Sequence, residues 1–329
     1  MRKFYAIILS FVMFLISFTG CSSSNDKVSV KLNEVTHSVF YAPLYLAIEN
    51  GYFEEENISV ELTNGGGADS SMTAVLSGSA DIGLMGPETV IYVHNQGKKD
   101  LPKVFGQLTQ KDGSFLVSRK AEPDFKWSDL KGKEILAGRK GGVPAMTFEY
   151  VLNSLDLYNG KDFTLNFDVQ FNMMTSAFLS GVADYCTVFE PTASEYQSTG
   201  KWHIVASVGQ ESGEIPYTSF IALESYIKNN ESTVKSFLSA IKKAHEYIAN
   251  HSEYEVAVAI VKQFPSTSIT SIEQSIKSYK SIDAWKTNLQ ASEASFERLQ
   301  DVMQNAGELD TRVAFEKLVN NDLAKEIFG

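Results

Sequence analysis

Cysteine is scarce in this chain of 329 residues, which contains only Cys21 and Cys186. Two cysteines cannot supply a disulfide framework. Cys186 stands in the apolar run ADYCTVF, where a buried small hydrophobic side chain is expected and a reactive thiol is not. If Cys21 carries a modification, as argued below, no internal disulfide can form.

Clusters of basic residues are missing as well. Acidic residues outnumber Lys and Arg by 40 to 29, and the formal net charge is −11. Because phosphate backbones are bound by a basic surface, a nucleic-acid partner is excluded. Two catalytic signatures are also absent, the H-E-x-x-H zinc motif and the G-x-S-x-G nucleophile elbow. His245 and His251 of HEYIANH are spaced wrongly for one helical face, so no metal site is expected.

The first twenty residues differ from the rest of the chain. MRK supplies a positive start, FYAIILSFVMFLISF is almost continuously apolar, and TGC follows. This layout is typical of a signal peptide, with a membrane-spanning helix as the alternative. FTGC resembles the lipobox of bacterial lipoproteins, with Phe18 in place of the usual leucine. We therefore expect a signal peptide over residues 1–20, lipidation of Cys21, a polar tether over residues 21–27, and an extracytoplasmic protein anchored to the cell membrane.

The remaining pattern alternates between short strands and helices joined by short loops, which predicts an α/β fold with parallel strands. The length favours two lobes. We expect the first part of lobe 1 over residues 28–112 and lobe 2 over residues 113–224. Helices should fill residues 225–329, and in ESTVKSFLSAIKKAHEYI the residues Val234, Phe237, Leu238, Ile241, His245 and Ile248 form one apolar stripe.

One phrase occurs twice, as LSGSADIGLMGPE (residues 76–88) and LSGVADYCTVFEP (residues 179–191). Its Gly and Asp residues are explained by a helix stop and a turn before the next strand. Each copy then delivers a glutamate, Glu88 or Glu190, near the carboxyl end of a strand, where open parallel sheets bind ligands. We expect the two glutamates to face each other across a cleft, although acids at helix starts are also favoured by the helix dipole.

Several segments resemble one protein family in their order and spacing. These are the lipobox, LAIENGYFEEENISVEL, LSGSADIG, DLKGKEIL and FEPTAS. Together they look like the extracytoplasmic solute-binding proteins of ABC importers, in the nitrate, sulfonate and taurine group that includes binders of thiamine-pyrimidine precursors. The resemblance implies a type II periplasmic-binding-protein fold with two α/β lobes, two crossing segments and C-terminal helices returning to lobe 1. It also implies a monomer that closes on a small solute and docks on a permease and its ATPase.

The same resemblance places the ligand among loops that follow strands. It points to Tyr41, Asn64, Gly65, Gly66, Glu88, Arg139, Gly141, Gly142, Glu190 and Tyr217. The glycine-rich loops precede helices, so their backbone N–H groups can cradle polar groups. The two tyrosines can stack on a planar ligand or serve as core aromatics. The arginine can clamp an anion or pair with a local acid.

Two carboxylates on the cleft walls would repel anions. They favour an aminopyrimidine-type thiamine precursor, with aliphatic sulfonate, taurine or nitrate as the alternative. Pyrimidine-binding relatives commonly carry an Asn-His pair where this chain has Phe40 and Tyr41, while His37 lies nearby. A eukaryotic enzyme branch uses a cysteine-rich iron motif and a lysine-bound cofactor, which one mature cysteine cannot supply. We therefore expect no catalysis and no cofactor, and a sensor component stays open beside the importer.

Overall fold

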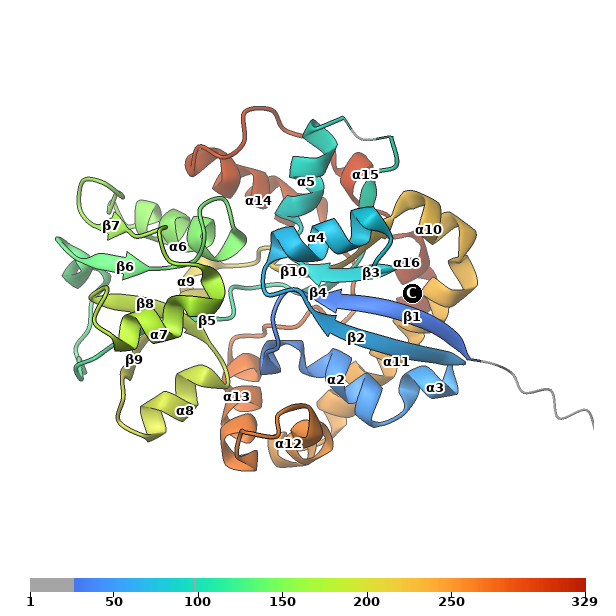
Figure 1. The fold of residues 1–329 in the computed structure, drawn as a ribbon, viewed down its shortest axis with the longest axis horizontal. Helices are drawn as coiled ribbons and strands as arrows, with labels where there is room; N and C mark the ends of the chain where they lie inside the picture. Colours follow the sequence, from blue (N-terminus) through green and yellow to red (C-terminus); the bar gives the residue numbers. More distant parts are fainter. Residues whose placement is uncertain (1–26, 98) are drawn as a thin grey trace, which may run out of the picture.

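The computed structural model describes residues 27–97 and 99–329, and it contains two five-stranded sheets (Figure 1). The expected signal peptide and Cys21 lie outside the described residues. The first sheet has the order β2-β1-β3-β10-β4. Its strands are β1 (Val28–Glu34), β2 (Ile58–Asn64), β3 (Ile82–Met85), β4 (Pro102–Thr109) and β10 (Thr218–Leu223). Strands β1, β2 and β3 are parallel, while β10 runs antiparallel to both of its neighbours.

The second sheet has the order β7-β6-β8-β5-β9 and forms the other lobe, at the left of Figure 1. Its strands are β5 (Ser114–Ser118), β6 (Glu134–Leu136), β7 (Thr164–Leu165), β8 (Tyr185–Phe189) and β9 (His203–Ser207). β6 is parallel to β7 and β8, whereas β5 is antiparallel to β8 and β9. Each lobe thus repeats one plan, parallel strands completed by a strand of opposite direction.

Helices connect the strands of each lobe, and glycines end several of them. In lobe 1, Gly78 ends the helix before β3 with φ of 74°, a left-handed conformation that glycine adopts without steric cost. The lobe 1 helices are η1 (Val39–Tyr41), α2 (Ala42–Glu49), α3 (Tyr52–Glu55), α4 (Ala68–Ser77) and α5 (Glu88–Asn95). Those of lobe 2 are η2 (Trp127–Leu130), α6 (Val143–Ser154), η3 (Phe171–Met173), α7 (Met174–Leu179), α8 (Thr192–Ser198) and α9 (Val208–Ser212).

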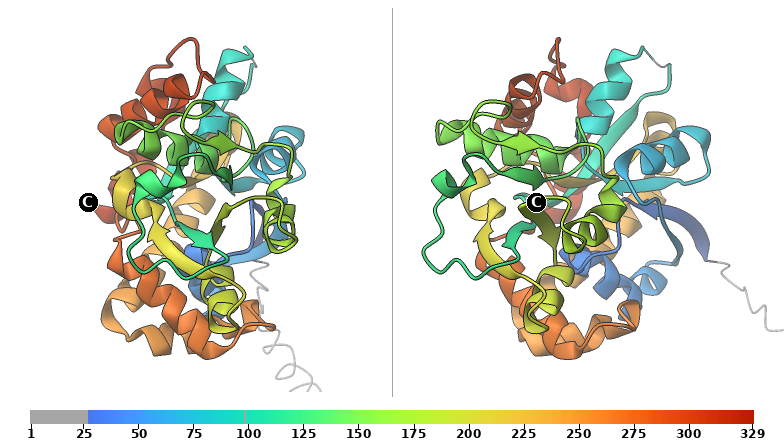
Figure 2. Two further views of the ribbon diagram at one scale, coloured as in Figure 1. Left: turned by 90° about the vertical axis from the view of Figure 1, so that its left-hand side faces the viewer. Right: turned by 60° about the vertical axis from the view of Figure 1, so that its left-hand side comes forward.

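The C-terminal third is helical, as the sequence predicts. Its helices are α10 (Glu224–Asn229), α11 (Glu231–Asn250), α12 (Glu253–Ile260), η4 (Val261–Gln263), α13 (Ile269–Ser281), α14 (Glu293–Asn305), α15 (Phe315–Leu318) and α16 (Asp322–Phe328). The predicted apolar stripe of α11 is buried, and this helix packs on α2 and α3 of lobe 1. α15 and α16 contact β4, while α13 and α14 also reach lobe 2 at α8 and α6 (Figure 2).

The predicted type II arrangement is confirmed, with one correction to its bounds. Residues 113–224 were expected to form lobe 2, but β10 at the end of that range belongs to the first sheet. The chain therefore returns to lobe 1 before residue 218. Periodicity alone could not place β10, because a strand that pairs antiparallel at a sheet's interior looks the same in sequence in either lobe. The buried state of Cys186, which is fully shielded, agrees with the expectation.

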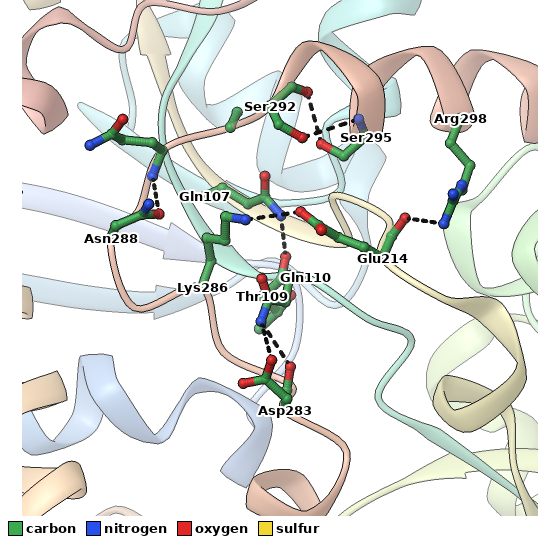
Figure 3. Close-up of polar contacts among 12 residues, drawn as sticks. Gln107, Thr109, Gln110, Glu214, Asp283, Lys286, Asn288, Ser292, Ser295 and Arg298 are labelled. Carbon is green, nitrogen blue, oxygen red and sulfur yellow. Dashed lines mark hydrogen bonds and ion pairs between the residues drawn. The ribbon is translucent and has the colours of Figure 1, made fainter.

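Three chain segments lie side by side between the lobes (Figure 3). Two are the crossing segments, after β4 and before β10, and the third belongs to the C-terminal part. Gln110 donates its amide N–H to Asp283 Oδ2 at 3.0 Å, joining the first to the third. Lys286 Nζ lies 2.9 Å from Glu214 Oε1, joining the third to the second. The hinge is therefore a three-segment bundle, which limits the directions in which the lobes can move.

Candidate ligand-binding site

The main pocket lies between the lobes, where strand ends of both sheets meet. It encloses about 550 Å³ of space free of atoms, part of it open to solvent. The lining residues come from segments at the carboxyl ends of β1, β2, β3, β6, β7 and β8 and from the second crossing segment. They are Val35, Thr36, Tyr41, Gly67, Ala68, Gly86, Glu88, Arg139, Gly142, Val143, Pro144, Phe171, Phe189, Tyr217 and Thr218.

Glu88 places a buried carboxyl in this pocket. The residue opens α5 and is only 1% exposed. A Cβ on Gly86 would lie 2.1 Å from Glu88 Oε2, so only glycine leaves room for the carboxyl to fold back over the strand end. Oε2 is buried and has no hydrogen-bond partner in the described part of the chain. Burial raises the pKa of Glu88 to about 7, although Arg139 and nearby backbone N–H groups act against this shift.

Arg139 approaches from the other lobe. It follows β6, and its Nη2 lies 3.9 Å from Glu88 Oε1 and 3.0 Å from Oδ1 of Asp69 on α4. The arginine side chain is 29% exposed, whereas Asp69 is 73% exposed. The sequence left open whether Arg139 clamps an anion or pairs with acids of the protein, and in the structure it pairs with acids. The acids, however, belong to lobe 1, so the pairing crosses the cleft.

Aromatic rings form much of the remaining wall. Tyr41 and Tyr217 are both buried and both line the pocket, as expected, together with Phe171 and Phe189. The ring centroids of Phe189 and Tyr217 are 6.2 Å apart, and Phe171 lies 6.2 Å from Phe189. Tyr217 Oη is buried without a hydrogen-bond partner among the described residues, and burial, with the Asp112 carboxyl nearby, raises its pKa. Such a wall suits a planar ligand that offers a polar group to one hydroxyl.

Two helices point their first residues at the pocket. Gly67 and Ala68 begin α4, and Gly142 and Val143 begin α6. The first backbone N–H groups of a helix have no partner within it. At α6 the Gly142 N–H donates to the Arg139 carbonyl and the Val143 N–H lies near the Glu88 carboxyl, so the start of α4 is the freer source of donors for a ligand. Gly142 was expected here. Of the lobe 1 loop NGGGA, the structure brings the last two residues to the pocket and not the first three.

Asn64, Gly65 and Gly66 instead shape the turn that precedes α4. Asn64 Oδ1 accepts a hydrogen bond from the Gly66 N–H at 2.8 Å. A Cβ on Gly65 would lie 2.6 Å from Asn33 Oδ1, so this glycine permits close packing. Gly141 also lies outside the pocket lining, because its carbonyl turns to Tyr92 Oη at 2.9 Å. Loop position was predictable, but which residue of a loop faces the ligand depends on its turn.

Glu190 does not face Glu88, so the expected facing pair is wrong. Its carboxylate accepts hydrogen bonds from the Ser194 N–H at 2.9 Å and from Ser194 Oγ at 2.7 Å. It therefore caps the first turn of α8. Ser278 Oγ also donates to Glu190 Oε1 at 3.4 Å. Glu190 lines a second chamber next to the pocket. Burial raises the pKa of Glu190, while the Ser194 hydrogen bonds act in the opposite direction.

The second chamber is more polar than the first and shares Thr36, Phe171 and Phe189 with it. At its edge, His37 Nδ1 lies 2.7 Å from Glu34 Oε1 and Nε2 lies 2.8 Å from the Gln263 carbonyl. Both partners can accept, so a protonated His37 would donate through both ring nitrogens. Burial acts to lower the pKa of His37, but the Glu34 carboxylate outweighs it and the pKa is raised. Sequence reasoning missed several lining residues. Phe171 had no signal in the sequence, whereas predicted site residues of the same loops stand close to three others, Thr36, Val143 and Phe189.

Comparison with known proteins identifies the family. The family model described as NMT1/THI5 like matches residues 39–255. A Bacillus subtilis protein named as a binding protein, YtlA, is 43% identical over 96% of this chain and 94% of its own length. The chain belongs to the NMT1/THI5-like family. A Haemophilus influenzae protein named for thiamine biosynthesis is a more distant relative of this family member, 24% identical over 94% of this chain and 96% of the relative.

Solved structures share the fold of this NMT1/THI5-like protein. The nitrate-binding protein NrtA from Synechocystis PCC 6803 superposes with a TM-score of 0.75 at 16% identity, covering 92% of this chain and 88% of that one. The alkanesulfonate-binding protein SsuA from Xanthomonas axonopodis pv. citri, bound to MOPS, gives 0.72 at 16% identity, covering 90% and 99%. The likeness confirms the two-lobe fold of periplasmic binding proteins.

Metal ligands and membrane-spanning helices were considered over the described part of the chain. Within residues 27–97 and 99–329, no group of three or more His, Cys, Asp or Glu side chains is arranged to bind a metal ion. In the same ranges, no helix is both long and apolar enough to span a membrane. The pocket itself combines one buried carboxyl, one arginine, two helix starts and several aromatic rings. This combination can bind a small, partly aromatic molecule through few hydrogen bonds.

Proposed function

We propose that this protein is the solute-binding component of an ABC importer and that its solute is an aminopyrimidine-type thiamine precursor. The observation that carries the proposal is the buried Glu88 carboxyl, which belongs to a pocket lined by aromatic rings and has Oε2 unpaired within the described residues. An amino group on a planar ring would donate to that oxygen while the ring contacts Tyr41, Phe189 or Tyr217. Family membership supports the assignment, because one relative is named for thiamine biosynthesis.

A carboxyl is a better partner for such a ring than for an anion. A carboxylate accepts hydrogen bonds only, while its protonated form can also donate one. Because burial raises the pKa of Glu88 to about 7, both forms are accessible near neutral pH. The carboxyl can therefore accept from an amino group and, when protonated, donate to a ring nitrogen. A sulfonate or nitrate offers acceptors alone, so it could use only the protonated form.

The second candidate solute is an aliphatic sulfonate, taurine or nitrate. Its support is Arg139 together with the first N–H groups of α4 and α6, which are ordinary anion-binding groups. The binding proteins NrtA and SsuA share the fold. Against it, Arg139 already faces Asp69 and Glu88. An anion would have to take the arginine from two carboxylates, at a cost in electrostatic energy.

In the cell, we propose that Cys21 carries the lipid anchor and that residues 1–20 are removed. Two acyl chains on one cysteine suffice for stable membrane attachment. The protein then works outside the cytoplasm as a monomer, and the closed lobes dock on a permease with its ATPase. Binding without catalysis or a cofactor is the proposed activity. A receptor could use the same closure, and a sensor role is distinguished by the partner protein that the closed form contacts.

A thermal-shift screen tests the proposal. The purified protein is heated with aminopyrimidines, alkanesulfonates, taurine and nitrate, each at millimolar concentration. A ligand at 100 times its dissociation constant adds about 2.7 kcal/mol of apparent stability. We expect an upward shift with an aminopyrimidine and none with the anions. A shift with a sulfonate alone would reject the aminopyrimidine assignment in favour of the second candidate, and mass analysis of the recovered ligand reveals any turnover.

A further inference from the structure

The loop between β6 and α6 of lobe 2 contacts both lobe 1 and the C-terminal part. Tyr92 Oη of α5 donates to the Gly141 carbonyl at 2.9 Å. Lys140 Nζ lies 3.6 Å from Glu308 Oε1 in the C-terminal part. Gly141 has φ of +70°, and a Cβ there would lie 3.1 Å from Glu308 and 3.2 Å from Tyr92. Glycine is needed for this close contact, which fixes the loop against lobe 1.

The fixed loop positions Arg139 at the pocket. The Gly142 N–H donates to the Arg139 carbonyl at 3.1 Å and closes the loop into a tight turn. A Cβ on Gly142 would lie 3.1 Å from Arg139 Cγ, so glycine leaves room for the arginine side chain in this turn. Its guanidinium then reaches Glu88 and Asp69 of lobe 1. The positive charge is supplied by one lobe and the negative charges by the other, and they meet only when the lobes are together.

The two carboxylates differ in how much they need this charge. Asp69 is 73% exposed, so water solvates it in any case. Glu88 is 1% exposed, and a buried carboxylate without a counter-ion is costly. Tyr41 and Tyr217, the other ionisable groups of the lining, remain neutral because burial raises the pKa of both. Arg139 is therefore the cation that balances Glu88 inside the closed pocket.

We propose that Arg139 is a specificity-determining residue, which balances Glu88 so that the closed pocket accepts an electrically neutral ring and rejects a cationic ring of the same shape. This inference rests on the proposed function and narrows its substrate class. A ligand cation would share the one buried carboxylate, Glu88, with Arg139, because Asp69, although 3.0 Å from Arg139, is 73% exposed and is screened by water. A neutral ring adds no charge, so the Glu88–Arg139 pair keeps its balance when the ring occupies the pocket.

Two probes that differ in charge test the inference. They are 4-amino-2-methylpyrimidine and its ring-N-methylated pyrimidinium salt, titrated calorimetrically into the mature protein at pH 8, where the first is neutral. The quantity compared is the ratio of the two dissociation constants. We expect the wild type to favour the neutral ring by at least about tenfold, since like charges a few ångströms apart in a dry site repel strongly.

Three variants decide whether Arg139 sets that ratio. Arg139→Gln should reduce the preference by about tenfold or more, because Glu88 then accepts a ligand cation in place of the arginine. Arg139→Lys keeps the charge and should keep the preference. Lys161→Gln, the matched control, removes an exposed cation of lobe 2 that neither lines the pocket nor holds the loop, and it should leave the ratio unchanged. Because the ratio is compared, loss of affinity through the added methyl group cancels.

Each result has one meaning. A preference in Arg139→Gln equal to that of the wild type would overturn the inference while leaving the aminopyrimidine proposal intact. A wild-type protein that binds the cationic ring more tightly than the neutral one would also overturn the inference and leave the aminopyrimidine proposal intact. If neither ring binds the wild-type protein, the proposed substrate is rejected and the inference falls with it. Circular dichroism of Arg139→Gln shows whether the variant is folded; if it is not, Arg139→Ala, which removes the same charge, is measured in its place and should show the same reduced preference.

Discussion

Glu88 and Glu190 end the same repeated phrase in two equivalent lobes, yet their carboxyl groups have opposite surroundings. Glu88 Oε2 has no partner in the described part of the chain, whereas both oxygens of Glu190 are bound by Ser194. The order of the residues explains the contrast. Glu88 follows Pro87 and lies inside the first turn of α5, while Glu190 precedes Pro191 and stands before α8.

Neighbouring side chains reinforce this difference. Gly86, two residues before Glu88, lets the carboxyl fold back toward the strand, but the residue two before Glu190 is Val188. Four residues after the glutamate, lobe 2 offers the hydroxyl of Ser194 and lobe 1 offers Tyr92, whose hydroxyl turns to Gly141. A glutamate before a helix is satisfied by the helix. A glutamate folded back onto a strand end is left for a ligand, so the repeat encodes a scaffold and not a symmetric site.

The pH dependence of stability should separate the two glutamates most strongly. The pKa of Glu88 is raised from 4.5 to about 7, so between these values the folded state binds more protons than the unfolded state. Stability due to this group is therefore lost as the pH rises from 4.5 through 7. Relative to the wild type, Glu88→Gln should gain about 2–3 kcal/mol between pH 5 and pH 8.

Urea unfolding of wild type and variants at several pH values measures this gain. The comparison between proteins cancels the contributions of other titrating groups, such as Asp112, whose pKa burial also raises to about 7. Glu190→Gln is the matched control and should show a smaller pH-dependent change, because the Ser194 hydrogen bonds favour its ionised form. Equal changes in the two variants would show that the two sites do not differ in electrostatics.

Ligand affinity should distinguish the same pair. With an aminopyrimidine ligand, Glu88→Gln should weaken binding by about 2 kcal/mol, as expected for a hydrogen bond to an ionisable group. Glu190→Gln should leave affinity nearly unchanged, since its carboxylate lies outside the main pocket. Isothermal titration calorimetry gives both values. A larger loss in Glu190→Gln would move the binding site into the second chamber.

The fold was largely predictable from the sequence, and the site was predictable only to the level of loops. Alternating strands and helices and the stripe of α11 are local signals, so periodicity carries them. The antiparallel return of β10 and the capping role of Glu190 depend on distant contacts or on the exact course of a turn. Tyr41, Glu88, Arg139, Gly142 and Tyr217 line the pocket as expected. Asn64, Gly65, Gly66 and Gly141 miss it because neighbouring residues of the same loops turn toward the cleft.

The cap itself can be removed without touching Glu190. Ser194→Ala deletes the hydroxyl that donates to Glu190 Oε1 at 2.7 Å but keeps the backbone N–H. The loss of one such hydrogen bond should lower the free energy of unfolding by about 1 kcal/mol. Ser198→Ala, on the exposed side of the same helix, is the control and should change it little. If ligand affinity falls with Ser194→Ala while stability does not, Glu190 is a binding residue after all.

The smallest expected effect concerns the tyrosines, which repeat the contrast between a free and a satisfied polar group. Tyr217 Oη has no hydrogen-bond partner among the described residues, so Tyr217→Phe should leave stability unchanged and weaken ligand binding by about 0.5–1 kcal/mol. Tyr45 Oη donates to Glu34 Oε2 at 2.6 Å and lies outside the pocket lining, so Tyr45→Phe should lower stability and spare affinity. Thermal unfolding and calorimetry on both variants measure the two quantities. If Tyr217→Phe lowers stability and spares affinity, the hydroxyl is structural, and the ligand contacts in this wall are made by the rings alone.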